Sequence, residues 1–482
     1  DKAGATVKGI VYAGDEPLRG VAVSDGAEIV FTDAEGRYWL PTDKRSGSVF
    51  ITIPSGYEVS ADGVFPRFWA ALEAPAKEVE RHDFALTKVD NDRHVMLAVT
   101  DIHLSNQNSD IEQFCTRFIP DVRAVAESFG DTPVYSLNMG DSAWDGYWYT
   151  NRYSLKDFRR TMNIVGYPAQ MFCAMGNHDN DFMTTSDYDA AVKYVDCIGP
   201  TFYSFNIGQV HYVVMDNIDC SAYDGTDSRN YVKKLSNEQL KWLAKDLAYV
   251  DKSTPLIVAM HAQIYKPTST GFAFDHDSAN TEALLAALDG YEVHFVTGHT
   301  HKVYNITPDD DVVKGRDIHE HNSGAICASW WWSGNLTPGV HVSIDGAPGG
   351  YAIWDIDGTD FAWLYKSTGW PEEYQFRSYD LNQCHITAEA FAPESTEAEM
   401  GAYSDTYGTK NNKNEILVNV WGYDPEWKVE MTENGKPLEV KRVVAKDPLH
   451  IISYEAKRLN VGATPTADFV SCATAHMFKA TA

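Results

Sequence analysis

The chain has 482 residues, of which 44% are hydrophobic and 22% charged, as in folded proteins with apolar cores. Its formal net charge of −28 excludes the Lys/Arg-rich surfaces that bind nucleic acid without sequence preference. Nothing in the sequence approaches the roughly 20 apolar residues of a transmembrane helix. The length predicts about two to four domains.

Residues 1–90 are predicted to form a separate β-rich unit. Short β-like segments alternate there with turn sequences, among them Ala-Gly-Asp at 13–15 and Asp-Ala-Glu-Gly at 33–36. Regular short strands of this kind are typical of a small antiparallel sandwich. The pattern resembles carboxypeptidase-regulatory-like and other Ig-like modules. We therefore predict an Ig-like β-sandwich with a spacer or partner-contact role, joined to the rest of the chain by the charged stretch at 77–93.

Five apolar segments further along each end on a group of Asp, Asn or His residues. The segments are 94–100, 134–139, 171–175, 255–260 and 293–297. Such near-continuous apolar runs are typical of strands buried on both faces, with helices packed over them. Because ligands bind at the carboxyl ends of strands in open α/β sheets, we expect the groups to converge. They supply seven candidate metal ligands: Asp101, His103, Asp141, Asn177, His261, His299 and His301.

These side-chain types indicate a two-metal hydrolase. Carboxylate, amide oxygen and imidazole suit divalent first-row metals, and no cysteine joins the groups. Two cations about 3.5–4 Å apart stabilise both the attacking and the leaving oxygen of an in-line displacement. Manganese, iron, zinc or a mixture fit these ligands equally well.

The five groups, in the order DxH, GD, GNHD, a lone His and GHxH, resemble the calcineurin-like metallophosphoesterase family. The resemblance implies a two-sheet α/β sandwich flanked by helices. It also implies that Asp141 bridges two metals, that His178 protonates the leaving oxygen or stabilises phosphoryl charge, and that Asp179 orients its neighbours. One metal would be held by Asp101, His103 and His301, and the other by Asn177, His261 and His299.

One difference narrows the subclass within this resemblance. Purple acid phosphatases carry GDxxY, with a tyrosine that ligates iron, and lack the histidine of DxH. Here Trp144 follows Asp141 in the GDSAW segment, and His103 is present. A colourless enzyme of the phosphodiesterase-like branch is therefore expected.

The predicted catalytic domain runs over residues 93–372. Apolar spacing predicts helices at 118–129 and 235–247, and hairpins are predicted at 203–216 and at 349–369, the latter turning at Asp357-Gly358. Residues 373–482 are predicted to form a β-rich C-terminal module, with Asn434-Gly435 as a turn signal. The three-part arrangement resembles exported bacterial metallophosphoesterases with an Ig-like N-terminal module. That resemblance, and a first residue other than Met, predict a periplasmic or cell-surface protein.

Substrate contacts are predicted from two aromatic stretches, at 141–149 and 330–332, and from a His-rich stretch at 318–322. The candidates are Trp144, Tyr147, His319, His321 and Trp330. Two interpretations stay open for the aromatic residues, since they either stack on a sugar, base or lipid headgroup or seat the C-terminal module. For the two histidines the alternative is a structural role.

Other polar residues have simpler expected roles. His294 is expected to be a hydrogen-bonded core residue, whereas Asp216 and Asn217 either form a turn or approach the site. The seven cysteines lack CxxC spacing, so mostly free thiols are expected, with one bridge left open.

The predicted function is hydrolysis of a phosphomonoester or phosphodiester in a small substrate, by in-line attack of a metal-bridging hydroxide. One alternative is cleavage of a pyrophosphate or phosphodiester bond in an envelope glycan, sugar-nucleotide or lipid precursor. A second is a glycan-binding surface protein without catalysis. The sequence does not determine the oligomeric state.

Overall fold

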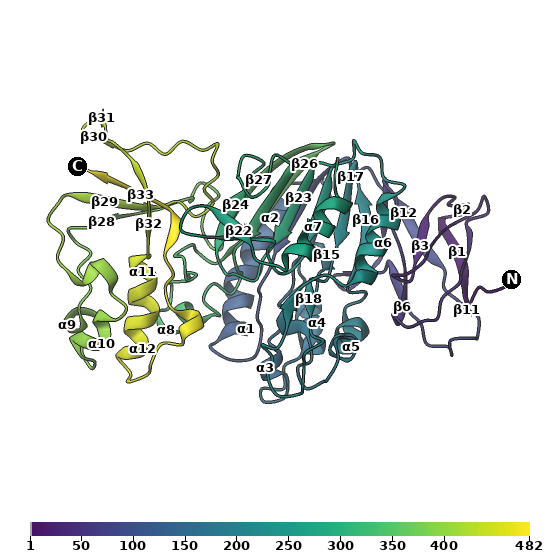
Figure 1. The fold of residues 1–482 in the computed structure, drawn as a ribbon, viewed down its shortest axis with the longest axis horizontal. Coiled ribbons are helices and arrows are strands. Elements are labelled where there is room, and N and C mark those ends of the chain that lie inside the picture. The colour runs from purple at the N-terminus through teal and green to yellow at the C-terminus, as the bar shows by residue number, and fades with distance from the viewer. Residues whose placement is uncertain (1) are drawn as a thin grey trace.

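Three parts of the molecule lie in a row in the computed structural model, which describes residues 2–482 (Figure 1). An N-terminal β-sandwich lies at one end, an α/β sandwich in the middle and a C-terminal part at the other end. Asp1, the first residue of the predicted N-terminal unit, lies outside the described residues.

The N-terminal sandwich consists of two facing sheets and a short ribbon. Its central strand β1 pairs in parallel with β11 and β12 and antiparallel with β2 and β5, while β7 pairs with β12. The second sheet has the order β10-β6-β3-β4, and β8 pairs with β9. The strands are Val7–Ala13 (β1), Glu16–Pro17 (β2), Ala22–Ser24 (β3), Ile29–Phe31 (β4), Arg37–Leu40 (β5), Ser48–Ile51 (β6), Tyr57–Val59 (β7), Ala61–Asp62 (β8), Phe65–Pro66 (β9), Trp69–Ala71 (β10), Glu80–Arg81 (β11) and Phe84–Lys88 (β12).

The central sandwich is built from two larger sheets. The first has the order β15-β14-β13-β26-β27 and the second β16-β17-β20-β23-β25-β24. The strands of the first sheet are Arg93–Val99 (β13), Val134–Asn138 (β14), Gln170–Cys173 (β15), Gly350–Asp357 (β26) and Asp360–Ser367 (β27). Those of the second are Tyr203–Ile207 (β16), Val210–Val214 (β17), Leu256–Ala259 (β20), Val293–Thr297 (β23), Val303–Ile306 (β24) and Ile318–Ser323 (β25).

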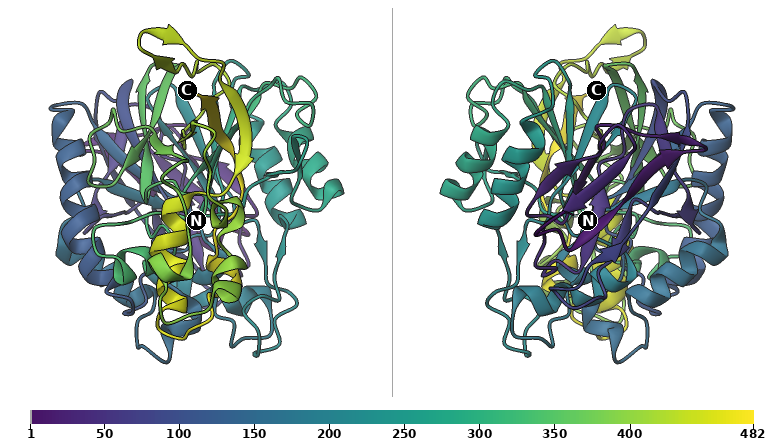
Figure 2. Two further views of the ribbon diagram at one scale, coloured as in Figure 1. Left: turned by 90° about the vertical axis from the view of Figure 1, so that its left-hand side faces the viewer. Right: turned by 90° about the vertical axis from the view of Figure 1, so that its right-hand side faces the viewer.

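Helices cover the outer faces of both sheets. Figure 2 shows the blue helices of the first sheet on one side and the teal to green helices of the second on the other. The helices are Asp110–Gln113 (α1), Ile119–Ser128 (α2), Asp145–Trp148 (α3), Leu155–Val165 (α4), Asp187–Cys197 (α5), Asn237–Leu247 (α6), Ser278–Ala287 (α7) and Trp332–Leu336 (α8). Two small ribbons, β18 (Ile218–Asp219) with β19 (Val232–Lys233) and β21 (Tyr265–Pro267) with β22 (Phe272–Phe274), complete this part.

The predicted elements of the central sandwich are confirmed. The five apolar segments form β13, β14, β15, β20 and β23, and both hairpins are present as β16–β17 and β26–β27. The predicted second helix is α6, and the hydroxyl of Ser236 accepts a hydrogen bond from the backbone N–H of Gln239 at its start. Among residues 2–482, no helix combines the length and hydrophobicity that a membrane crossing requires.

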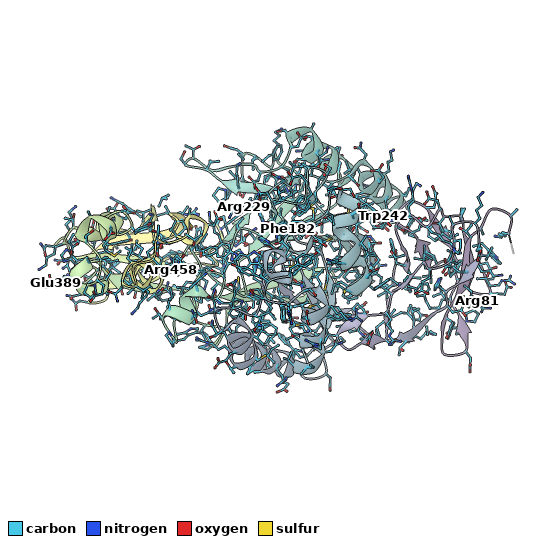
Figure 3. All side chains as sticks on the ribbon, turned by 90° about the horizontal axis from the view of Figure 1, so that it is seen from below. Arg81, Phe182, Arg229, Trp242, Glu389 and Arg458 are labelled. Atoms are coloured by element: carbon cyan, nitrogen blue, oxygen red, sulfur yellow. The ribbon has the colours of Figure 1, made fainter. Side chains whose placement is uncertain are left out.

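The N-terminal sandwich shares its apolar core with the central sandwich. One continuous cluster of buried side chains runs from Val7 and Phe50 to Tyr203 and Val258. Trp242 of α6, labelled in Figure 3, packs edge-on against Phe50 and donates its indole N–H to the Ser24 hydroxyl at 3.1 Å. Because the indole ring is buried and its N–H is hydrogen-bonded, this contact stabilises the interface between the two sandwiches.

The C-terminal part has a separate apolar core. Four strands in the order β28-β29-β33-β32 pack against short helices. The elements are Arg377–Asp380 (β28), Glu415–Asn419 (β29), Thr432–Glu433 (β30), Lys436–Pro437 (β31), Lys441–Ala445 (β32), Thr474–Thr481 (β33), Ala388–Phe391 (α9), Glu397–Gly401 (α10), Pro448–His450 (α11) and Ala456–Leu459 (α12). The β30–β31 hairpin turns at Asn434 and Gly435, both with positive φ, as the turn signal predicted.

Candidate metal centre

The candidate ligands come from two sheets whose carboxyl edges meet. In the first sheet, Asp101 and His103 follow β13, Asp141 follows β14 and Asn177 follows β15. In the second, His261 follows β20, while His299 and His301 follow β23. These seven side chains, the seven-residue cluster, lie together in two groups.

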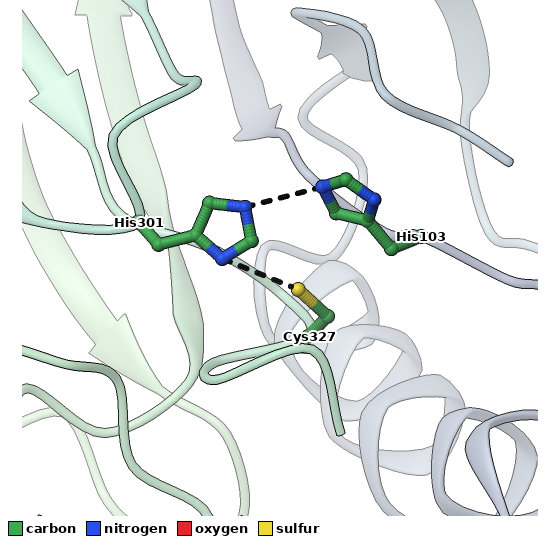
Figure 4. A group of neighbouring side chains, drawn as sticks. All are labelled: His103, His301 and Cys327. Atoms are coloured by element: carbon green, nitrogen blue, oxygen red, sulfur yellow. Dashed lines mark hydrogen bonds between the residues drawn. The ribbon is translucent and has the colours of Figure 1, made fainter. Parts of the chain in front are cut away.

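The first group contains Asp101, His103 and His301. Oδ1 of Asp101 lies 3.2 Å from Nε2 of His301 and 3.5 Å from Nε2 of His103. The two imidazole Nε2 atoms face each other at 3.1 Å, and Cys327 Sγ lies 3.6 Å from the far nitrogen of His301 (Figure 4). All four side chains are buried.

The second group contains Asn177, His261 and His299. Nε2 of His261 lies 3.0 Å from Oδ1 of Asn177 and 3.1 Å from Nδ1 of His299. Asp141 lies between the groups, because its Oδ2 is 3.4 Å from Nε2 of His103 and 3.2 Å from Nε2 of His261. These contacts bring together the residues that the resemblance assigns to each metal, and metal binding by either group stays a prediction.

The hydrogen bonds around the cluster suit a cation. His261 donates its Nδ1–H to the carbonyl of Met139, and His301 donates its own to the carbonyl of Ala328, each at 2.8 Å. Both rings therefore turn an Nε2 lone pair towards carboxylate and amide oxygens that are also acceptors. Oδ1 of Asp101 is buried without a hydrogen-bond partner. Acceptors that face one another in a buried site require a positive charge between them.

The backbone at the cluster is held in an uncommon conformation. Five of its residues have left-handed φ angles between 48° and 69°: Asp101, His103, Asp141, His299 and His301. For residues with a Cβ this conformation costs roughly 1 kcal/mol each, and it is found mainly at functional sites. It turns the chain sharply after each strand, so that the side chains point towards the shared edge.

Two motif glycines allow the strands to approach closely. A Cβ on Gly176 would lie 2.2 Å from Oδ1 of Asp141, and one on Gly298 would lie 2.5 Å from Oδ2 of Asp101. Both positions therefore require glycine for steric reasons.

Asp179 lies behind the cluster and binds backbone. Its carboxylate accepts hydrogen bonds from the N–H groups of Asp141, Ser142 and Gly176 at 2.8–2.9 Å. Burial and the neighbouring charge of Asp141 raise the pKa of Asp179 to about 7. Asp179 thus connects the GD and GNHD loops, which is the orienting contact expected of it.

His178 is paired with a residue that the sequence analysis did not identify. Its Nδ1 lies 2.7 Å from Oδ1 of Asp145, the first residue of α3. The side chain of Asp145 is completely buried. Burial alone would lower the pKa of His178, but the carboxylates of Asp141 and Asp145 raise it. The sequence signal that could have identified Asp145 is its position, because it is a second carboxylate four residues after Asp141.

The predicted aromatic contacts lie beside the first group. Trp144 lies 5.4 Å from the ring of His103 and 5.6 Å from that of His178, and Tyr147 packs edge-on against it at 5.0 Å. Trp330 stacks on His301 at 3.8 Å. Trp144, Tyr147 and Trp330 are only partly buried, so each reaches the surface beside the cluster.

The two histidines of β25 are not brought to the cluster. His319 and His321 stack on His294 of β23, and His321 also meets Trp363 of the facing sheet. Burial lowers the pKa of His319 to about 4, which keeps this ring neutral. His294 is buried and shares a 3.0 Å hydrogen bond with His321, which confirms its expected core position.

Asp216 and Asn217 follow β17, and Asn217 holds the loop after β20 in place. Asn217 brackets the backbone of Ala262, donating to its carbonyl at 2.6 Å and accepting from its N–H at 3.1 Å. Asp216 accepts from the N–H of Ile218, as in a turn. All seven cysteines are free.

Comparisons with known proteins agree with this geometry. Residues 95–303 match the model of the calcineurin-like phosphoesterase family, residues 5–89 match its N-terminal model and residues 320–482 match its C-terminal model. Together the three models span nearly the whole chain. The chain therefore belongs to the calcineurin-like phosphoesterase family and is a metal-dependent phosphoesterase.

Solved structures with similar parts are distant. A dimetal phosphatase from Danio rerio is 13% identical, with 57% of this chain and 96% of that chain covered and a TM-score of 0.37. The purple acid phosphatase of yellow lupin (Lupinus luteus) seeds is 13% identical, with 59% and 55% covered and a TM-score of 0.38. A 5'-nucleotidase from Candida albicans is 13% identical, with 57% and 52% covered and a TM-score of 0.34. No curated protein matches the chain significantly in sequence.

Proposed function

We propose that the seven-residue cluster holds two divalent cations and that the chain hydrolyses phosphomonoesters or phosphodiesters in small substrates. The position of Asp141 carries this proposal, because one carboxylate oxygen lies within 3.4 Å of a histidine from each group. Asp101, His103 and His301 would hold one cation, and Asn177, His261 and His299 the other. When bound, such a pair supplies a nucleophilic water at neutral pH and neutralises phosphoryl oxygens.

The chain's own groups supply the proton chemistry. His178 donates Nδ1–H to Asp145, which leaves Nε2 for the substrate. A protonated imidazole in this position donates a proton to the leaving oxygen, and the Asp145 carboxylate favours that protonated form. The backbone N–H of His178 donates to Oδ1 of Asp141 at 2.8 Å, so the acid and the bridging carboxylate are held in fixed relation.

A second candidate is cleavage of a phosphodiester or pyrophosphate bond in a glycan, sugar-nucleotide or lipid precursor. It is favoured by the partly exposed rings of Trp144 and Trp330 beside His103 and His301. Flat aromatic faces at the opening of a site suit an organic group larger than a simple alkyl ester.

Metal reconstitution tests the proposal. Metal-stripped protein is assayed on nitrophenyl and bis-nitrophenyl phosphate with manganese, zinc, iron(II) or magnesium added back, and bound ions are counted by mass spectrometry. We expect about two ions per chain and restored turnover with at least one metal. A protein that binds no metal, or binds two ions without hydrolysing any of a wide range of phosphoesters, would contradict it.

A further inference from the structure

A phenylalanine of the C-terminal part contacts the aromatic residues beside the metal centre. Phe469 ends a short 3-10 turn, Ala467–Phe469, more than 160 residues beyond His301. Its ring is 4.4 Å from that of Trp330 and 6.2 Å from that of Trp144. We call Trp144, Trp330 and Phe469 the aromatic group.

The aromatic group is directly connected to the cluster. Trp330 stacks on His301, with ring centres 3.8 Å apart and planes within 18°. Trp144 lies beside His103 and His178. All three side chains of the group are partly exposed, so part of each ring remains accessible beside the proposed proton donor.

The segment that carries Phe469 is tied on both sides. The N–H of Thr466 donates to the Tyr454 hydroxyl at 3.0 Å, within the C-terminal part. Asp468 forms an ion pair with Arg229, which is labelled in Figure 3 and belongs to the central sandwich. An exposed ion pair contributes little stability, but it fixes which part of the central sandwich the segment meets.

The same central loop reaches the other half of the cluster. Tyr231, two residues after Arg229, places its ring 6.2 Å from that of His299. The Asp468–Arg229 pair therefore joins the C-terminal segment to a loop that lies against the second group. Residues of both parts of the chain thus surround the cluster.

We propose that the aromatic group binds the leaving group of the substrate, and that this leaving group carries a ring with an apolar face, either a sugar or a nucleobase. The inference rests on the proposed function, because His178 defines the leaving-group side. Apolar ring faces gain favourable stacking when a second ring covers them, whereas an acyclic alcohol offers no such surface. Phe469 makes the C-terminal part a contributor to substrate selection.

Substrate selectivity of the metal-loaded full chain tests the inference. Adenosine 5'-phosphate, glucose 6-phosphate and glycerol 3-phosphate, with their methyl diesters, compare a nucleobase, a sugar ring and an acyclic leaving group. We expect Phe469→Ala to lower kcat/KM for one ring-bearing substrate about tenfold relative to the glycerol ester, mainly through KM. Phe469→Tyr should restore the ratio, since it keeps the ring.

Phe376→Ala is the matched control, because it removes a phenylalanine of the C-terminal part that is 55% exposed. We expect it to keep the wild-type ratio. Equal losses on ring-bearing and glycerol esters in Phe469→Ala, with a lower Tm, would overturn the inference and make Phe469 a structural contact.

A binding measurement keeps the inference separate from the proposed function. Calorimetric titration with adenosine and methyl glucoside requires no turnover. Binding of either that weakens about tenfold in Phe469→Ala supports the aromatic group even if no phosphoester is hydrolysed. Absence of binding by both, together with an unchanged selectivity ratio, would overturn it.

Discussion

Nδ1 of His178 lies 2.7 Å from Oδ1 of Asp145, a carboxylate with no exposed surface. This hydrogen bond fixes the orientation of the imidazole, and Oδ1 of Asp145 is itself held by the backbone N–H of Gly146 at 2.8 Å. The contact connects α3 to the GNHD loop and joins two motifs that are more than 30 residues apart. A buried carboxylate that orients a histidine also stabilises its protonated form.

Removing His178, the proposed general acid, should slow chemistry without removing metal. We expect His178→Ala to reduce kcat by about 10²- to 10⁴-fold on esters with poor leaving groups, because these need protonation. Asp145→Asn should reduce it by about 10- to 100-fold, since Asn keeps a hydrogen-bond acceptor but not the charge. Steady-state kinetics and ion counting check both.

Nitrophenyl esters provide the control for this prediction. Nitrophenolate leaves without a proton, so both variants should lose much less rate on it. An equal loss on good and poor leaving groups would argue against the general-acid role of His178.

Substitution of Asp141, the proposed bridging carboxylate, should remove metal. In Asp141→Asn one charge is lost between His103 and His261, and we expect bound ions to fall below about two per chain, with almost complete loss of turnover. Asp224→Asn, on the exposed surface, is the matched control and should keep both. Two tightly bound ions in Asp141→Asn would show that the bridge is dispensable.

A single methyl group at Gly176 should displace the same carboxylate. The new Cβ would lie 2.2 Å from Oδ1 and 2.3 Å from the backbone nitrogen of Asp141, which is closer than unbonded atoms approach. We expect Gly176→Ala to lose metal affinity and to melt at a lower temperature. Gly401→Ala, where a Cβ meets nothing within 4 Å, should melt like the wild type, and equal behaviour of the two variants would refute the steric argument.

The free energy of unfolding should fall as the pH is lowered, because His94 is protonated more readily in the unfolded state than in the folded state. This buried ring shares hydrogen bonds with the Tyr212 hydroxyl and the Asn91 carbonyl, and burial lowers its pKa from 6.5 to about 4 although Asp355 and Asp92 oppose the shift. The folded state thus keeps His94 neutral while the unfolded state takes up a proton. Neutral His94 makes its full contribution to the free energy of unfolding above pH 6.5. That contribution is lost as the pH falls towards 4, by up to about 3 kcal/mol.

Urea unfolding between pH 7 and pH 4.5 measures this loss. Other buried histidines, such as His319 and His341, have pKa values lowered to about 4 by burial and act in the same direction. We therefore compare slopes: the free energy of unfolding of His94→Gln should fall less steeply with acid than that of the wild type. Parallel slopes would contradict the prediction.

The catalytic elements were predictable because their signal is local. An apolar segment that ends on Asp, Asn or His specifies both a buried strand and the edge where its ligands lie, as for β13 with Asp101 and β23 with His299. The division of five such strands between two sheets is not visible in any one segment. It depends on pairing between distant strands, such as β13 with β26.

Residues that act through contacts across the chain were missed. Asp145 lies in an aromatic loop where an Asp before Gly suggests a turn, and only the folded position of His178 gives it a partner. Phe469 has no motif around it, and its proximity to Trp330 follows from docking of the C-terminal part. His319 and His321 lie within β25 rather than after its carboxyl end, and there they stack on His294 and pack between the sheets.

The apolar core shared by the N-terminal and central sandwiches has a consequence for how the protein unfolds. A boundary in the chain near residue 90 is not a boundary in the packing, since Phe50 and Tyr203 belong to one cluster. The two sandwiches should lose their structure cooperatively, in a single calorimetric transition. The C-terminal part has a main core of its own and joins the central part through a small cluster that includes Trp421, Val303 and Tyr365. A chain without it would keep all seven cluster residues but lose Phe469.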